Sequence, residues 1–379
     1  MRSHLFTEDH ELFRATVREF ITREVAPHLE EWERAGHIEP DLWRTAGELG
    51  LLGLGVPEEY GGGGSDDYRF RCVLMEGLAR VGAAAVNVVF GGFDDLVGPY
   101  LVDLGTPQQK LQWLPGLCAG ELGAAIAMTE PGAGSDLRGI RTTAVREADH
   151  WVLNGSKTFI TGGARADVVV TVARTAEQEF SLFLVDGKTP GFTRGRALDK
   201  LGQRAEDVSE LFFEDVHVPA ENLLGTEGAG FGHLMERLPK ERMSIAYYGL
   251  AAAEAALDWT VAYTKERRAF GKPIAQFQHT TFALAELATE IDVTRAYLDR
   301  AVLALNEGEL TAVDAAKAKW WATELQNRVV TRCLQLHGGY GYMREYPIAR
   351  AFVDARATTI YGGTTEIMKS IVGRELVRD

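Results

Sequence analysis

Glu241 stands between a lysine and an arginine, and a carboxylate held in such a position can act as a general base. Taken alone, a Lys-Glu-Arg triplet on a helix usually indicates a surface exposed to water. Pro239 adds information, because proline either starts a helix or kinks one. A ligand that removed water from Glu241 would raise its pKa, whereas the charge of Arg242 would lower it. The sequence leaves open which effect is larger.

Residues 127–137, Ala-Met-Thr-Glu-Pro-Gly-Ala-Gly-Ser-Asp-Leu, are suited to holding a polar ligand. Their glycines let the backbone approach a ligand closely and leave amide groups free to donate hydrogen bonds. Thr129 and Ser135 add hydroxyl groups. A Gly-Ala-Gly loop after an apolar strand is more often an ordinary turn, so only the complete string favours a binding role.

Arg267 and Arg268 form a third candidate for binding, because the planar guanidinium fork matches the geometry of a pyrophosphate. The usual role of such a pair is a solvated charge on the surface of a helix. For Arg268 we keep that interpretation.

Helices are expected to position these residues on both sides of a β-rich middle. Thr7 followed by acidic residues marks one helix start, Pro40 marks another, and residues 69–79 have helical periodicity. Helical periodicity recurs after residue 228 in three long segments, 245–257, 282–297 and 313–330. Long antiparallel helices with short connections indicate a bundle.

The middle of the chain has the alternation typical of strands. Residues 151–160 contain Asn154-Gly155, a dipeptide typical of a tight turn, so we expect two strands around it. Three further β-rich segments follow, at 167–172, 180–185 and 211–218. We therefore predict three domains, covering residues 1–120, 121–225 and 226–379.

The bulk composition excludes some classes of function. With 379 residues, 46% of them hydrophobic, the chain can bury a large core. Its formal net charge of −14 leaves no basic stripe for nucleic acid, and its apolar stretches are too short to span a membrane. The three cysteines have no metal-ligand spacing and no obvious pairing, which favours a reduced, cytoplasmic setting, and the N-terminus lacks the apolar run of a signal peptide.

Several motifs together resemble the acyl-CoA dehydrogenase family over nearly the whole chain. They are residues 127–137, 154–157, 159–161, 213–219, 267–271, 278, 337–341 and 360–367. Residues 238–242, 318–319 and 324–327 resemble the long-chain acyl-CoA dehydrogenases in particular. The resemblance implies a mainly α, α+β fold with an N-terminal helical domain, a middle β-barrel-like domain and a C-terminal four-helix bundle.

The resemblance also implies that FAD is the cofactor. The residues that match flavin contacts are Ile126, Met128, Thr129, Gly134, Ser135, Phe159, Ile160 and Thr161, with Thr364 and Glu366 of the C-terminal loop. Many family members have tryptophan at the position of Phe159, and phenylalanine can still pack on a ring.

A second group of residues matches positions that reach the cofactor of a neighbouring subunit. These are Arg267, Phe270, Phe277, Gln278, Gln335, Leu336, Gly338 and Gly339. The family is usually a homotetramer arranged as a dimer of dimers, so the resemblance implies at least a dimer.

Dehydrogenation of an acyl thioester requires a base for the α-proton, and many family members carry it on the C-terminal loop, where this chain has Gly362. Glycine has no carboxylate, but its backbone amide would still donate a hydrogen bond to the thioester oxygen. Glu241 matches the alternative base position of the long-chain and isovaleryl-type enzymes. Glu366 is the rival base, at a cofactor-side position. Further substrate contacts are implied for Ser135, Arg242, Tyr361 and Gly363.

The implied activity is the FAD-dependent conversion of a medium-chain, long-chain or branched acyl-CoA to trans-2-enoyl-CoA, as in fatty acid β-oxidation. Its electrons would pass to an electron-transfer flavoprotein. The alternatives are a thioester on an acyl carrier protein from secondary metabolism, a flavin oxidase or monooxygenase on the same scaffold, and a catalytically silent flavin- or acyl-CoA-binding protein. The presence of Glu241 argues against the silent protein.

Two departures from the family pattern concern the region around the substrate. Glu206 and Val208 stand where the family more often has serine and threonine, near the cofactor and the thioester entrance, which indicates a different acceptor or carrier. Asp94 and Asp95 fall where the family lines the far end of the acyl pocket. We expect them to start a helix, and the alternative is that one of them faces a polar acyl group.

Overall fold

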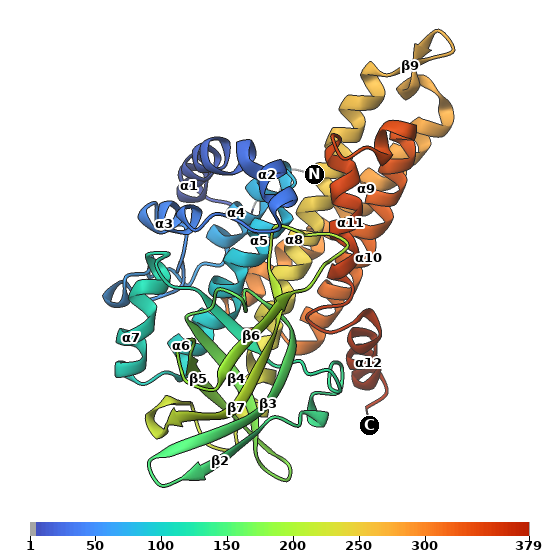
Figure 1. Ribbon diagram of the computed structural model, residues 1–379. Helices are drawn as coiled ribbons and strands as arrows, with labels where there is room; N and C mark the ends of the chain where they lie inside the picture. Colours follow the sequence, from blue (N-terminus) through green and yellow to red (C-terminus); the bar gives the residue numbers. More distant parts are fainter. Residues whose placement is uncertain (1–4, 379) are drawn as a thin grey trace.

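The computed structural model describes residues 5–378, with helices toward both ends of the chain and a sheet between them (Figure 1). The predicted mainly α, α+β class is confirmed. The segment considered above as the N-terminus lies partly outside the described residues. Among the helices of residues 5–378, none is both long and apolar enough to cross a membrane.

The N-terminal part consists of short helices that pack around one another. They are α1 (Glu8–Phe20), α2 (Leu29–Ala35), α3 (Asp41–Glu48), α4 (Arg69–Arg80), α5 (Ala84–Gly91), α6 (Gly98–Leu104) and α7 (Pro107–Cys118). As predicted, Thr7 and Pro40 precede the first residues of α1 and α3. A π-helical segment, η4 (Gly92–Val97), joins α5 to α6, so residues 84–104 form one helical run.

The middle part is a sheet with the strand order β6-β7-β3-β2-β4-β5-β8, in which β1 pairs in parallel with β4. Its strands are β1 (Ala124–Ala127), β2 (Thr143–Glu147), β3 (His150–Thr161), β4 (Val168–Ala176), β5 (Glu179–Asp186), β6 (Phe192–Ala197), β7 (Val208–Pro219) and β8 (Leu223–Leu224). The three segments expected at 167–172, 180–185 and 211–218 are therefore strands.

The hairpin predicted around Asn154-Gly155 is wrong, because β3 runs through this dipeptide as one strand. The pairing of β3 with β7 shifts here, because the two steps from Leu153 to Gly155 face three steps on β7, from Val216 to Phe213, so the extra residue of the bulge lies on β7 opposite the dipeptide. The Asn154 side chain hydrogen-bonds Asp215 on β7 instead of closing a turn. Gly155 has a φ of +151°, and a Cβ there would lie 2.5 Å from Thr142 Oγ1, so glycine fits this close approach.

Strand β4 joins the sheet to the helices, because its successive side chains point to opposite faces. Val168, Val170 and Val172 belong to the large core shared with the helices, whereas Val169 and Ala173 belong to the core within the β-domain. Two cores therefore meet at one strand, which fixes the sheet against the helical parts.

The C-terminal part is built on three long helices, as predicted. They are α8 (Gly230–Glu266), α9 (Gln278–Asn306) and α10 (Ala312–His337), followed by α11 (Pro347–Thr358) and α12 (Thr365–Leu376). A small hairpin of β9 (Arg268–Ala269) and β10 (Lys272–Pro273) joins α8 to α9. In Figure 1 this hairpin lies at the end of the long helices that is remote from the sheet.

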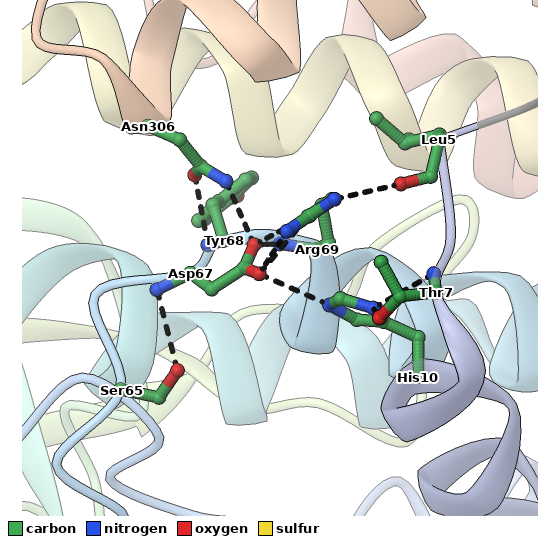
Figure 2. A network of polar contacts seen from close by, with 8 residues as sticks. All are labelled: Leu5, Thr7, His10, Ser65, Asp67, Tyr68, Arg69 and Asn306. Carbon is green, nitrogen blue, oxygen red and sulfur yellow. Dashed lines mark hydrogen bonds and ion pairs between the residues drawn. The ribbon is translucent and has the colours of Figure 1, made fainter.

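A polar network fixes the start of α1 against α4 and the end of α9 (Figure 2). Asp67 accepts hydrogen bonds from Arg69 at 2.6 Å and from Asn306 at 2.7 Å, and it contacts His10 Nε2 at 3.2 Å. Although burial raises the pKa of Asp67, the hydrogen bonds from Arg69 lower it to about 2. The carboxylate therefore stays charged and holds three elements that are far apart in the sequence.

Candidate active site

Glu241 lies in the interior of α8, and its side chain is buried, as is that of Arg242. The interpretation of this triplet as a surface exposed to water is therefore wrong for these two residues. Pro239 also lies inside α8 and does not start it. The hydroxyl of Tyr100, from α6, donates a hydrogen bond to Glu241 Oε1 at 3.0 Å.

Burial raises the pKa of Glu241 to about 7, even though the Tyr100 hydrogen bond and the charge of Arg242 lower it. Burial by the protein alone, without a ligand, therefore raises the pKa of Glu241 by more than the charge of Arg242 lowers it. At neutral pH, a carboxyl group with a pKa near 7 is deprotonated in a fraction of the molecules and can therefore accept a proton. Once protonated, it also releases that proton readily. Glu241 is therefore chemically suited to be a general base.

Replacing Tyr100 with phenylalanine is expected to shift the pH dependence of catalysis upward. A carboxyl group accepts a proton only when it is deprotonated, so with Glu241 as the base kcat/KM should rise with pH through about 7. The Tyr100 hydrogen bond stabilises the carboxylate, and its loss should move the midpoint up by roughly one pH unit. The pH profiles of kcat/KM for the two proteins measure this shift. Equal midpoints would show that Tyr100 does not control the base.

The loop that contains Gly362 contacts α8 and α10 closely. Arg242 Nε donates to the Gly362 carbonyl at 3.5 Å, and Lys319 Nζ donates to the Gly363 carbonyl at 2.6 Å. Gly362 has a φ of +64°, and a Cβ there would lie 2.3 Å from Cδ1 of Ile245 on α8. A side chain at this position would be strained by the positive φ and would displace the end of the Ile245 side chain, and with glycine there the loop contributes backbone groups rather than a carboxylate.

Two buried lysines, Lys319 at the Gly362 loop and Lys157 at the glycine-rich segment, were not predicted as functional. Lys319 is fully buried, and its pKa is lowered to about 7. Burial is the larger cause, and the positive charge of Arg242 adds to it. Lys157, fully buried on β3, donates to Glu130 Oε1 at 2.9 Å and to the Met128 carbonyl at 3.1 Å. For Lys319 the signal that could have found it is a lysine beside alanine and tryptophan residues, which would need a polar partner when buried. Lys157 lies between Ser156 and Thr158, so its local sequence carries no such signal.

The Glu130–Lys157 pair fixes the glycine-rich segment. Glu130 also accepts hydrogen bonds from the backbone amides of Arg141 at 2.7 Å and Thr142 at 2.9 Å. The amide of Thr158 donates to the Thr129 carbonyl at 2.9 Å. These bonds bring the end of β1 and the end of β3 together, so the segments predicted to hold the flavin ring are neighbours.

Within these two segments the predicted residues differ in what they expose. Gly134 and Ser135 are exposed, and a Cβ at Gly134 would meet no atom within 4 Å, so their backbone is open to a ligand. Phe159 is 67% exposed and has a φ of +58°, which is strained for phenylalanine and directs an aromatic ring outward. Ile160 is buried in the β-domain core, so only its backbone can contact a cofactor. The half-buried residues are Ile126, Met128, Thr129 and Thr161.

The two predicted cofactor contacts of the C-terminal loop, Thr364 and Glu366, also differ in their exposure to solvent. Thr364 accepts a hydrogen bond from the amide of Ile367 and caps α12, and Glu366 is exposed in the first turn. Hydrogen bonds to the backbone and to Thr364 lower the pKa of Glu366, which makes it a weaker base than Glu241. The Tyr361 hydroxyl accepts a hydrogen bond from Gln203 at 3.5 Å.

Glu206 lies beside this region and is buried. It forms an ion pair of 3.5 Å with Lys200, and burial raises its pKa to about 7. At this position the family more often has a residue with a hydroxyl group. This chain has instead a buried carboxyl group whose pKa is about 7.

A second group of predicted residues lines a separate cavity of about 540 Å³. The predicted residues among its lining are Arg267, Gln335, Leu336, Gly338 and Gly339. The Arg267 guanidinium lies over the ring of Tyr340, 5.4 Å from its centroid. A cation, an aromatic ring and glycine backbone form a suitable cradle for the pyrophosphate and adenosine of a dinucleotide.

The hairpin beside this cavity carries exposed side chains. Phe270 is 96% exposed, its ring lies 6.1 Å from that of Phe277, and Gln278 is exposed at the start of α9. Arg268 is also exposed, as expected, but it lies in β9 rather than on a helix and donates to the Gly271 carbonyl. This hairpin and the sheet lie at different ends of the long helices (Figure 1), so one chain does not bring the two predicted halves of a cofactor site together.

Asp94 and Asp95 do not start a helix, so that expectation is wrong. They lie in η4, in the middle of the helical run formed by residues 84–104. Asp95 is buried and forms an ion pair with Arg71 at 3.0 Å. Its carboxylate is therefore bound by a guanidinium group rather than by the free backbone amides of a helix start.

Comparison with known proteins gives matches along almost the entire chain. Residues 7–121 match the family described as "Acyl-CoA dehydrogenase, N-terminal domain", residues 125–216 match "Acyl-CoA dehydrogenase, middle domain", and residues 228–377 match "Acyl-CoA dehydrogenase, C-terminal domain".

Individual relatives agree with these matches. The long-chain specific acyl-CoA dehydrogenase, mitochondrial, of Sus scrofa is 47% identical over 99% of this chain and 88% of its own length. An acyl-CoA dehydrogenase of Geobacillus kaustophilus is similar in structure, with a TM-score of 0.96, 46% identity and coverage of 99% of this chain and 100% of that one. An acyl-CoA dehydrogenase of Bacillus anthracis complexed with FAD has a TM-score of 0.92 and 33% identity, with coverage of 98% and 67%.

Proposed function

We propose, from the premise that this chain belongs to the acyl-CoA dehydrogenase family, that Glu241 is the base of its FAD-dependent reaction with an acyl-CoA. The enzyme is an oxidoreductase of that family and uses FAD. The observation that carries the assignment of the base is the buried Glu241 carboxyl group, whose pKa is about 7 and whose helix contacts the Gly362 loop.

In the proposed mechanism, Glu241 accepts the α-proton of the thioester. The Gly362 amide donates a hydrogen bond to the thioester oxygen and stabilises the negative charge that develops as the proton leaves. Arg242 and Lys319 hold the Gly362 and Gly363 carbonyls, and they thereby keep that amide in position. When bound, FAD accepts the hydride that leaves the β-carbon.

The residues present fit the cofactor. The exposed glycine backbone of residues 132–135 and the Phe159 ring suit the flavin, and the cavity at Arg267 suits the pyrophosphate and adenosine. Because these two groups lie apart in one chain, we propose that Arg267, Phe270 and Gln278 serve the cofactor of a neighbouring subunit in a homotetramer, a dimer of dimers. Glu366 and Thr364 remain proposed contacts on the flavin side.

The finer features of the function are proposals of the same kind. The substrate is a medium-chain, long-chain or branched acyl-CoA, and the product is the trans-2-enoyl-CoA. An electron-transfer flavoprotein accepts the electrons. We keep the proposed division into residues 1–120, 121–225 and 226–379 and the cytoplasmic setting, although long-chain relatives include mitochondrial proteins.

Anaerobic mixing of the FAD-loaded protein with acyl-CoA thioesters of increasing chain length tests this function. We expect the flavin absorbance to bleach with a subset of chains. Bleaching only by acyl-carrier-protein thioesters would favour the carrier-bound alternative, and fast reoxidation in air with release of peroxide would favour an oxidase. If no thioester bleaches the flavin at full FAD occupancy, the proposed function is wrong.

A further inference from the structure

Residues 198–207 connect β6 to β7, and the end of this connection is bonded to the end of β3. Thr161, the last residue of β3, pairs with Val208, the first residue of β7. The amide of Gly162 donates a hydrogen bond to the Asp207 carbonyl at 2.9 Å. The 198–207 connection therefore lies directly beside Thr161, one of the residues that match flavin contacts.

The same connection is also held at the C-terminal loop. The side chain of Gln203 donates to the Tyr361 hydroxyl at 3.5 Å and to the Asp354 carbonyl at 3.2 Å. The backbone amide of Gln203 donates to Asp354 Oδ1 at 2.5 Å. Tyr361 directly precedes Gly362, so the 198–207 connection joins the end of β3 to the loop assigned to the thioester oxygen.

Glu206 is a buried carboxyl group within this connection, and only 3% of its surface is exposed. Lys200 donates to its backbone carbonyl and lies 3.5 Å from its Oε2. Burial raises the pKa of Glu206 to about 7, whereas the charge of Lys200 and a hydrogen bond with the Thr161 side chain lower it. The pKa of Tyr361 is raised to about 12, chiefly by burial, and the charge of Glu206 adds to it. Glu206 thus interacts with both segments that the connection joins.

Other charged groups also lie around the connection. Asp207 raises the pKa of Glu206, and its own carboxylate accepts a hydrogen bond from a backbone amide at 2.9 Å. Glu33 of α2 accepts from two backbone amides of the connection, at 3.2 and 3.4 Å. Burial raises the pKa of Asp354, on α11, to about 7. Two carboxyl groups here therefore change charge near neutral pH, Glu206 beside Thr161 and Asp354 beside the backbone of the connection.

The hydroxyl group of Thr161 has one hydrogen atom, so it can donate to one acceptor at a time. An ionised Glu206 only accepts, and it competes for that hydrogen with the polar edge of the flavin. A protonated Glu206 can donate to the Thr161 oxygen and leaves the hydroxyl hydrogen to the flavin. The ionised form also places a negative charge near a group that gains electrons. Both effects make reduction of the flavin less favourable when Glu206 is ionised.

We propose that Glu206 is a positioning residue whose protonation state controls the hydrogen bond from Thr161 to the flavin and thereby how readily the flavin is reduced. This inference rests on the proposed function, in which the protein uses FAD. As the pH rises through about 7, Glu206 loses its proton, so reduction should become less favourable in that range. The hydroxyl group that the family more often has at this position would not ionise there.

The reduction potential of the FAD-loaded protein, measured anaerobically against reference dyes and without any acyl-CoA, tests this inference. The pH range extends about two units to each side of the Glu206 pKa of about 7, so that both protonation states are sampled. Over this range we expect the equilibrium constant for reduction to fall roughly tenfold more in the wild type than in Glu206→Gln, a difference of about 30 mV for a two-electron couple.

Glutamine keeps the shape of glutamate and can donate to Thr161, but it does not ionise. The potential of Glu206→Gln should therefore equal that of the wild type at the acidic end of the range and exceed it at the alkaline end. Glu206→Ser, which introduces the hydroxyl group that the family more often has, should also lack the additional fall and guards against a packing defect of the glutamine variant.

Asp354→Asn is the matched control, because it removes a second buried carboxyl group whose pKa is also about 7. Asparagine can still accept the hydrogen bond from the Gln203 amide, so the fold should persist. We expect this variant to keep the pH dependence of the wild type. If the additional fall disappeared in Asp354→Asn and persisted in Glu206→Gln, the titrating group would be Asp354 and the inference would be wrong.

Parallel potentials of the wild type and both Glu206 variants would also overturn the inference. Loss of FAD from both variants would do the same, because Glu206 would then serve the fold rather than the hydrogen bond of Thr161. Since no acyl-CoA is present, these results do not depend on Glu241. Failure of every thioester to bleach the wild-type flavin would instead contradict the proposed function.

Discussion

Replacing Glu241 with glutamine is expected to slow flavin reduction by an acyl-CoA roughly 10⁴-fold while FAD stays bound. Glutamine has the shape of glutamate and can still accept the Tyr100 hydrogen bond through its amide oxygen, so the fold should persist. It cannot accept a proton at neutral pH, so the α-proton has no acceptor. Anaerobic rapid mixing with a thioester that bleaches the wild-type flavin measures this rate.

A matched control for this variant is Glu19→Gln, at an exposed glutamate of α1 that forms an ion pair with Arg23. It should leave the rate unchanged. If Glu241→Gln reduced its flavin at the wild-type rate, Glu241 would not be the base, and Glu366 would be examined next. A loss of FAD from the variant would point to a structural role, so the flavin content is measured alongside the rate.

Replacing Lys157 with methionine is expected to destabilise the protein by about 3–5 kcal/mol, because it leaves the buried Glu130 carboxylate without its cation. The lost hydrogen bond to the Met128 carbonyl also frees the glycine-rich segment, so FAD should bind more weakly. Denaturant unfolding of the FAD-free protein and titration with FAD measure the two effects separately.

Two controls separate this effect from a general loss of charge. The double variant Lys157→Met/Glu130→Gln removes both charges and should recover a large part of the stability, since no unpaired charge stays buried. Arg23→Met breaks an exposed pair and should change the free energy of unfolding by less than about 1 kcal/mol. Equal losses in the buried and the exposed variant would contradict the role assigned to Lys157.

Local signals in the sequence predicted most of the fold. Thr7 and Pro40 mark helix starts because capping depends on the first few residues of a helix. The strands followed from alternation over a few residues. Asn154-Gly155 misled this reasoning, because the dipeptide has the local preference for a turn while its conformation is set by Thr142 and Asp215 on other segments.

The chemistry of the site depended on contacts that no local pattern contains. Glu241 differs from a surface glutamate through its burial and through Tyr100, which is 141 residues away in the sequence. Asp95 likewise has Arg71 as its partner, 24 residues earlier. The family resemblance supplied the position of the base, but only packing explains why that position has a raised pKa.

The separation of the two groups of cofactor residues along the long helices has a consequence for the behaviour of diluted protein. If each centre takes its flavin side from one subunit and its adenosine side from another, assembly and cofactor uptake are linked equilibria. Dilution would then release FAD, and added FAD would hold the subunits together. A substitution in the β9–β10 hairpin of one subunit would then impair the cofactor site of its neighbour, while the flavin side of its own site could stay intact. A mixture of subunits with substitutions on opposite sides of the site would form some complete cofactor sites, which neither variant forms alone.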